Sequence, residues 1–239
     1  MGHSLSAQRA SPVNLLGALR SGMASAALLL ASAGSVAATN LVANGSFESP
    51  VLSPGSDFLV VFVGGSNITD WSVVGPAGKN VAIIEELYDL PDGAGINFAA
   101  ADGVQWIDMT GGGSNSTEGV QQSVTLAPGA YTLSFYVGNV NEGANLGTQS
   151  TVDLWLNGSF IQSFTNSGPS GGAVNWQQFS HTFSGSGLTS IEFRNADAAS
   201  DHLNGLDGVF LAAVPEPSTV AMSISGLLLL GACLRRRRV

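Results

Sequence analysis

The sequence predicts one all-β domain, folded as a two-sheet sandwich, between two short terminal segments of different character. Apolar residues alternate with polar ones over short stretches, which is the pattern of half-buried strands. Clusters of Gly, Pro, Asn and Ser separate these stretches, and no window shows a long helical period. The 176 residues from 39 to 214 have room for roughly nine to eleven strands, enough for one sandwich with a proper core.

The clearest strands lie in the middle of the chain. Residues 119–126 alternate without a break, and Pro128-Gly129 is expected to turn the chain. Four apolar residues line one face of the next expected strand: Tyr131, Leu133, Phe135 and Val137. The sequence therefore predicts two separate strands on either side of Pro128-Gly129.

A hairpin and three closing strands follow. Alternate residues of 152–156 are apolar, and Asn157-Gly158 predicts a type I′ turn. The return strand is expected at 160–164. The closing strands are expected at 176–183, 189–195 and 206–211.

The charges are unevenly distributed. The chain of 239 residues has 8 basic and 17 acidic residues, for a net charge of -9. Residues 39–214 hold 16 acidic residues against only Lys79 and Arg194, so this region alone carries -14. Such a domain is not suited to nucleic acid, because that binding depends on Lys and Arg neutralising phosphates. An acidic polysaccharide would need bridging cations, so a neutral glycan is the simpler partner.

The first 38 residues have the layout of a secretory signal peptide. Arg9 and Arg20 supply positive charge ahead of the short apolar run 23–36, and Val36-Ala37-Ala38 fits the small-x-small cleavage rule. A buried helix of similar length is the alternative, but the segment lacks the polar face of such a helix. We therefore expect export and removal of residues 1–38.

The C-terminal end is a tail of three parts. Pro215, Glu216 and Pro217 come first, and the apolar run 220–234 follows. As a helix rising ~1.5 Å per residue the run spans about 22 Å, which is shorter than the ~30 Å hydrocarbon core. Flanking arginines extend its reach by snorkelling and stay cytoplasmic under the positive-inside rule. They are Arg235, Arg236, Arg237 and Arg238.

This tail resembles the PEP-CTERM sorting signal of Gram-negative bacteria. The resemblance implies recognition by an exosortase-type membrane protease-transpeptidase, with transient anchoring in the inner membrane before sorting to the cell surface or the extracellular matrix. The chain then divides into a signal peptide (1–38), a β-sandwich domain (39–213) and a sorting tail (214–239) with a transmembrane helix at 220–234. A plain single-pass membrane anchor is the alternative.

The domain carries a second resemblance, spread over five segments in order: 40–48, 101–108, 119–135, 176–179 and 205–211. Together they resemble the galactose-binding-like β-sandwich family shared by plant cell-wall proteins and many bacterial secreted proteins. The resemblance implies a jelly-roll sandwich and binding to cell-wall or extracellular polysaccharide. Related carbohydrate-binding modules often carry a structural calcium.

Glu48 and Asp207 are the candidate calcium ligands. Calcium takes six to eight oxygen ligands, largely carboxylates and carbonyls. The first and last strands of a jelly roll lie together near one edge, so Glu48 and Asp207 are expected to meet there. The family pattern often has a second acidic residue where this chain has Gly208. The alternative is that Glu48 is a solvated strand end and that Asp207 caps a turn.

Aromatic and acidic residues supply the candidate sugar-binding site, because a pyranose has an apolar C–H face and a polar rim. Asp153 and Trp155 point outward if their apolar neighbours face the core, and an outward Trp favours a stacking role. Trp106 and Asp108 share one face of their strand, although either face of that strand fits the core. Tyr88 lies in an acidic loop.

No catalytic constellation emerges from the sequence. A nucleophile elbow and a His-rich metal spacing are both missing, and the single cysteine excludes a multi-thiolate site. Asp201 and His202 are adjacent and so point to opposite sides of a strand. We therefore expect a non-catalytic exported protein that binds or organises exopolysaccharide. The alternatives are a hydrolase acting on the polysaccharide and a purely structural or adhesive matrix protein.

Overall fold

The computed structural model describes residues 38–53, 56–88, 95–112, 115–141, 146–199, 203–215 and 225–227. The chain divides into Met1–Ala37 and Ala38–Val239, and all described residues belong to the second unit. Nine strands are described: β1 (Phe58–Phe62), β2 (Ser72–Val74), β3 (Asn80–Glu85), β4 (Gln105–Asp108), β5 (Gly119–Asn139), β6 (Ser150–Leu156), β7 (Ser159–Asn166), β8 (Asn175–Asn195) and β9 (Gly205–Ala213).

The two terminal predictions lie largely outside the described residues. The signal peptide up to residue 37, the sorting-motif residues Glu216 and Pro217, and the four arginines are not described, whereas Pro215 is described and exposed. Of the apolar run 220–234 only 225–227 is described, as one helical turn. Within the described part of the chain no helix has the length and hydropathy of a membrane span.

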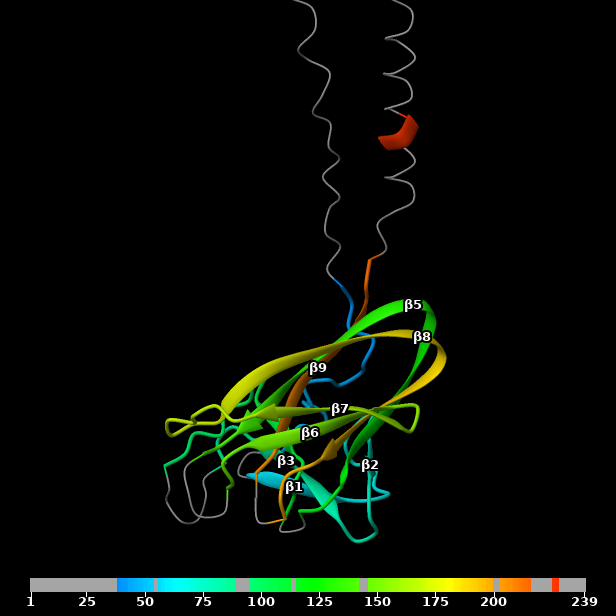
Figure 1. Ribbon diagram of the computed structural model, residues 1–239. Helices are drawn as coiled ribbons and strands as arrows, with labels where there is room; N and C mark the ends of the chain where they lie inside the picture. Colours follow the sequence, from blue (N-terminus) through cyan, green and yellow to red (C-terminus); the bar gives the residue numbers. More distant parts are fainter. Residues whose placement is uncertain are drawn as a thin grey trace, which may run out of the picture. The chain divides into compact units, whose positions relative to one another are not determined.

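The all-β prediction is confirmed, and every pair between named strands is antiparallel. The strands lie in the order β1-β3-β4-β9-β5-β8-β6-β7, and β2 pairs with β5 (Figure 1). The pairing is continuous from β1 to β7, so the two expected sheets are joined. The long, curved strands β5 and β8 make the join, as Figure 1 shows.

The turn predicted at Pro128-Gly129 is wrong. β5 continues through it, and the register with β8 shifts between Leu126 and Gly129. A β-bulge places two residues opposite one, which bends and twists a strand without reversing it. Proline is tolerated there because a bulge residue needs no ladder hydrogen bond. For the same reason the strands expected at 176–183 and 189–195 are one strand, β8.

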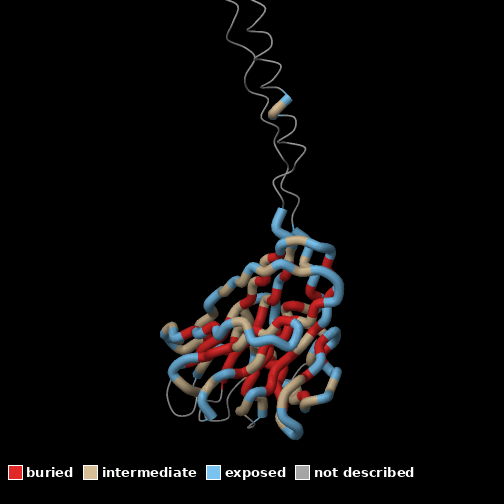
Figure 2. The backbone as a smooth tube through the Cα atoms, turned by 45° about the vertical axis from the view of Figure 1, so that its right-hand side comes forward, coloured by how far each residue is buried: buried red, intermediate tan, exposed pale blue. Residues whose placement is uncertain are grey.

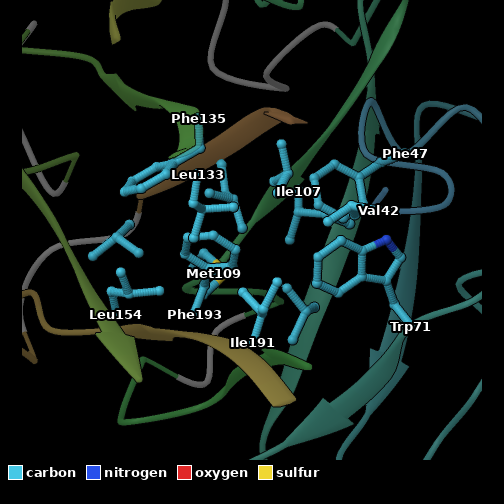
Figure 3. Packing of buried hydrophobic residues seen from close by; sticks show 14 of the residues in the cluster. Val42, Phe47, Trp71, Ile107, Met109, Leu133, Phe135, Leu154, Ile191 and Phe193 are labelled. Atoms are coloured by element: carbon cyan, nitrogen blue, oxygen red, sulfur yellow. The ribbon is translucent and has the colours of Figure 1, made fainter. Parts of the chain in front are cut away.

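The bend folds the sheet onto itself around a buried core. Phe135 pairs in register with Phe179, yet its ring lies 4.8 Å from that of Phe193, which pairs with Val120 near the other end of β5. The two halves of the β5–β8 ribbon therefore face each other as the two layers of a sandwich. Figure 3 shows Phe135 and Phe193 in this core with Trp71 and Phe47. Figure 2 shows the buried segments of the chain in the middle of the domain.

The predicted hairpin is confirmed. Asn157 and Gly158 have φ of 51° and 73°, as a type I′ turn requires, and they join β6 to β7. The alternate residues Val152, Leu154 and Leu156 are buried in the core.

The β3–β4 pair is buried on both faces, which a simple sandwich strand would not be. Ile83 and Ile107 lie in the main core, whereas Ile84 and Trp106 belong to a second buried cluster. That cluster includes apolar residues from outside the strands: Phe98, Val140, Val174 and Leu203. The loops that carry them cover the outer face of β3 and β4, and the candidate site lies under this cover.

Candidate functional site

A cavity of about 220 Å³ lies on the covered face of β1, β3 and β4. The described residues that line it are Phe58, Ala82, Ile84, Tyr88, Phe98, Trp106, Asp108, Gly111, Gly112, Leu146 and Leu203. Three of the residues singled out from the sequence, Tyr88, Trp106 and Asp108, therefore line one cavity.

The strand register determines which side chains of β1, β3 and β4 line one side of the cavity. Phe58 on β1 pairs with Ile84 on β3, and Ile84 pairs with Trp106 on β4. Side chains of directly paired residues stand on the same face of a sheet. A short cross-strand row of apolar side chains therefore forms one side of the cavity.

Four aromatic side chains around the cavity form a chain of ring contacts, each ring packing against the next. The rings of Phe58 and Tyr88 are 5.8 Å apart at 82°, and those of Tyr88 and Phe98 are 5.3 Å apart at 60°. Phe98 stacks on Trp106 at 6.4 Å, and the Trp106 Nε1 donates a 2.8 Å hydrogen bond to the Phe98 carbonyl. These edge-to-face and stacked contacts are the favourable geometries of aromatic pairs, so the walls are held in place.

Asp108 is the acidic group among the described residues that line the cavity. Its register partner on β3 is Ala82, two pairs along from the pair that Trp106 makes with Ile84. Its Oδ1 accepts hydrogen bonds from the Thr110 amide (2.9 Å), the Thr110 hydroxyl (2.8 Å) and the Asn204 amide (3.1 Å). The side chain is therefore fixed, with one oxygen fully engaged by the protein.

Burial raises the pKa of Asp108 to about 7, with a further contribution from the nearby Glu118 carboxylate. The hydrogen bonds from Thr110 and Asn204 act in the opposite direction but do not outweigh burial. Burial also raises the pKa of Tyr88, and Asp108 and then Asp57 add to that shift. Near neutral pH the cavity thus presents a neutral phenol and a carboxyl close to its titration point.

The expected calcium ligands lie at one loop, residues 101–105. The Oε1 of Glu48 accepts hydrogen bonds from the amides of Val104 and Gln105, both at 2.8 Å. The Oδ2 of Asp207 accepts from the amides of Ala101 (2.8 Å) and Asp102 (2.9 Å). The two carboxylates hold the two ends of the loop that leads into β4, and so they hold the strand that carries Trp106 and Asp108.

Backbone amides donate hydrogen bonds to both carboxylates. Calcium takes six to eight oxygen ligands, and Glu48 and Asp207 are only two side chains. Among the residues that the structure describes, no group of three His, Cys, Asp or Glu side chains could hold a metal. Asp207 is fully buried, and burial raises its pKa to about 8. The calcium site stays a prediction from the family resemblance, and in the structure both carboxylates accept hydrogen bonds from the loop 101–105.

Trp155 and Asp153 do not reach the cavity. They lie on β6, where the Arg194 guanidinium covers the Trp155 ring at 4.9 Å and Phe160 meets it edge to face at 5.7 Å. The Trp155 Nε1 is buried and has no hydrogen-bond partner among the described residues, and Asp153 accepts a 2.6 Å hydrogen bond from the Ser163 hydroxyl. The predicted sugar-binding residues thus form two separate groups.

Phe58 and Phe98 are the aromatic wall residues that the sequence did not indicate. Phe58 begins a strand, and Phe98 lies in a loop between small residues, so neither carries a periodic signal. Their contact with Tyr88 depends on how the loops fold over β3 and β4. Asp201 and His202, which the sequence placed side by side, lie outside the described residues.

Comparison with solved structures finds carbohydrate-binding β-domains. A family 35 carbohydrate-binding module from Clostridium thermocellum is 14% identical over 65% of this chain and 99% of that one, with a TM-score of 0.40. The family 35 module from Paenibacillus barcinonensis is 10% identical over 65% and 99%, with a TM-score of 0.38. The module TmCBM61, solved with β-1,4-galactotriose, is 13% identical over 74% and 100%, with a TM-score of 0.37.

Comparison of the sequence with protein families gives two matches. Residues 213–238 match the PEP-CTERM protein-sorting motif, which confirms the predicted sorting signal and indicates an exported protein. No curated protein matches the chain. The model of the HpiC1-like family, described as HpiC1 cyclase, matches residues 38–194, which is most of the β domain, and the chain therefore belongs to this family.

Proposed function

We propose that the exported domain binds carbohydrate without transforming it, and that one sugar ring occupies the cavity beside β4. The observation that carries this proposal is the meeting of Tyr88, Trp106 and Asp108 in one cavity. A sugar presents an apolar C–H face to aromatic rings and hydroxyl groups to a carboxyl, and both kinds of group are present here. The cavity, about 220 Å³, is smaller than the ~300–1,000 Å³ of drug-sized ligand sites, which suits a single ring.

Isothermal titration against neutral and substituted oligosaccharides, chosen from a glycan array, tests this proposal. Phe58 is the best residue to change, because it lines the cavity and is 49% exposed. Phe58→Ala is expected to weaken sugar binding about tenfold, the equivalent of ~1.4 kcal/mol. Phe62 is a matched control, since it lies on the same strand, is 57% exposed and does not line the cavity. Equal affinities of Phe58→Ala and wild type would refute the assignment.

Catalysis is the second candidate, and one specific observation favours it. The family model covering residues 38–194 is named for a cyclase, and Asp108 is a buried carboxyl with a pKa of about 7 in an aromatic cavity. A carboxyl with a pKa near the working pH is suited to general acid–base chemistry. Mass spectrometry of any bound ligand over time separates the candidates. An unchanged ligand supports binding, and a product that Asp108→Asn no longer forms supports catalysis.

The geometry does not favour the hydrolase alternative. Glycoside hydrolysis in most families uses a pair of carboxylates about 5–9.5 Å apart across the scissile bond. Asp108 is the only carboxylate among the described residues that line the cavity.

We further propose that the tail holds the protein transiently in the inner membrane until an exosortase-type enzyme processes it, and that the domain then reaches the cell surface or the extracellular matrix. The match of residues 213–238 to the sorting motif supports this route. Intact mass analysis of the protein from its producing cells tests it. Loss of the residues after about Pro217 supports processing, whereas an intact tail indicates a permanent anchor.

A further inference from the structure

We propose that the ligand of this cavity is a cationic amino sugar whose ammonium group lies against Asp108, between the faces of the surrounding aromatic rings. The inference rests on the proposed carbohydrate-binding function and names the substrate class of the same site. Three observations carry it: an uncompensated carboxyl, aromatic faces on several sides, and the charge of the domain.

Among the residues that the structure describes, the carboxyl of Asp108 has no cationic partner in the cavity. No Lys, Arg or His is among the described residues that line it, and the ion pair formed by Arg194 is with Glu192 on β8. Within the described ranges, all hydrogen bonds to the Asp108 carboxyl go to Oδ1. Its Oδ2 is therefore available to a ligand. A buried carboxylate is costly unless it is paired, so a cationic ligand would supply the missing charge.

The aromatic walls favour the same ligand. An ammonium group over the face of a Trp, Tyr or Phe ring is attracted by the ring quadrupole, and aromatic cages bind organic cations in this way. Phe58 and Tyr88 stand at 82° and Tyr88 and Phe98 at 60°, so their faces point in different directions. A small cation within this arrangement meets more than one ring.

The charge of the domain acts over a longer range. Residues 39–214 carry 16 acidic against 2 basic residues, and such a field concentrates cations and repels anions. The sequence charge already disfavours an acidic glycan. The cavity adds a reason to prefer a cationic sugar to a neutral one, because a neutral sugar leaves Asp108 unpaired. N-acetylation of the amine would remove this advantage, since it removes the charge and adds bulk.

Titration calorimetry with four probes tests the inference: a β-1,4 glucosamine trimer, its N-acetylated counterpart, cellotriose, and choline. We expect the glucosamine trimer to bind about tenfold more tightly than the other two sugars, and Asp108→Asn to abolish the difference. Phe58→Ala should weaken binding of the glucosamine trimer, and Phe62→Ala should leave it unchanged. Melting curves verify that Asp108→Asn is folded, and Phe58→Ala, which removes a half-exposed ring, provides an independent test.

Proton release gives a second readout. A cation beside Asp108 lowers the pKa of its carboxyl, so the glucosamine trimer should release protons on binding at pH 6 and cellotriose should not. Among the described residues, Tyr88 and Glu118 interact electrostatically with Asp108, and Asp57 interacts with Tyr88. The Asp108→Asn variant identifies the source of the protons. Equal affinity for all three sugars would overturn the amino-sugar inference and leave the proposed function standing. Binding of choline alone, or of none of the probes, would overturn both.

Discussion

Asp108 and Asp207 are both buried aspartates whose pKa values burial raises, yet the protein uses their oxygens differently. Asp207 accepts hydrogen bonds on both oxygens, from the amides of Ala101 and Asp102 on Oδ2 and from that of Gly208 on Oδ1. The carboxyl of Asp108 accepts its three hydrogen bonds from described residues on Oδ1. The backbone thus engages both carboxyl oxygens of Asp207, whereas only one carboxyl oxygen of Asp108 is engaged and the residue lines the cavity.

The comparison shows that burial and a raised pKa do not by themselves identify a functional carboxyl. The two residues differ in which of their carboxyl oxygens accept hydrogen bonds from the protein. Asp207 supports the loop that leads into β4, and Asp108 lies on β4 itself. Asp207 therefore supports the strand, and Asp108 lines the cavity.

The largest expected effect is on the stability of an Asp207→Ala variant. The substitution leaves three amides without their acceptor, and each buried, unsatisfied donor costs ~1–3 kcal/mol. We expect the free energy of unfolding to fall by at least about 3 kcal/mol, measured by urea denaturation. The isosteric Asp108→Asn should change it by less than about 1 kcal/mol, because the amide oxygen still accepts the hydrogen bonds made by Oδ1. Similar losses in both variants would contradict the division of roles.

The pH dependence of stability is the second expected effect. Burial raises the pKa of Asp108 to about 7 and that of Asp207 to about 8. The folded state therefore holds these protons at pH values where the unfolded chain has released them. The resulting stabilisation is complete below the unfolded pKa, near 4, and is lost as the pH rises through 7 to 8. Chemical denaturation at a series of pH values should show the free energy of unfolding falling over this range.

Asp108→Asn separates the two contributions to that fall. The variant should show a flatter dependence up to about pH 7, with the decline toward pH 8 retained because Asp207 is unchanged. A profile identical to wild type would mean that Asp108 does not titrate as its environment indicates.

The sequence predicted the strands of this fold better than the bends between them. Strict alternation identified 119–126 and 131–137 as extended, and Asn157-Gly158 identified a hairpin, because both signals are local. Pro128-Gly129 carries the same local signal as a turn, but pairing with β8 on both sides keeps the strand extended, and the extra residue becomes a bulge. Local chemistry could not decide between a turn and a bulge, since the choice depends on a partner strand far along the chain.

The candidate site was predictable in part for the same reason. Trp106 and Asp108 share a strand face, so alternation alone places them together. Tyr88, Phe58 and Phe98 join them only because loops fold over the outer face of β3 and β4, and that contact leaves no pattern in the sequence. Both faces of β4 are buried, which explains why the sequence did not show which face of this strand lies in the core.

Glu48→Gln should have a smaller effect than Asp207→Ala. Glu48 is only half-buried and accepts two amides on one oxygen. An amide oxygen can keep both hydrogen bonds but loses their charge assistance, so we expect a loss of about 1 kcal/mol in unfolding free energy. Adding calcium and then a chelator to wild type and variant tests the remaining calcium prediction in the same experiment. A melting temperature that rises with calcium in wild type but not in Glu48→Gln would support a metal role for Glu48 beyond its contacts with the amides.

The smallest expected effect on binding is that of Trp155→Leu. The Arg194 guanidinium covers one side of the indole, and Phe160 packs edge to face against it. A sugar would have to displace Arg194 to stack on the covered face, and it would lose the cation–π contact of ~0.5–1 kcal/mol that exists there. Affinity for the glycan that occupies the cavity should therefore change by less than about twofold, which calorimetry resolves as under ~0.4 kcal/mol. A larger loss in a folded Trp155→Leu variant would place a second sugar contact on β6, outside the cavity.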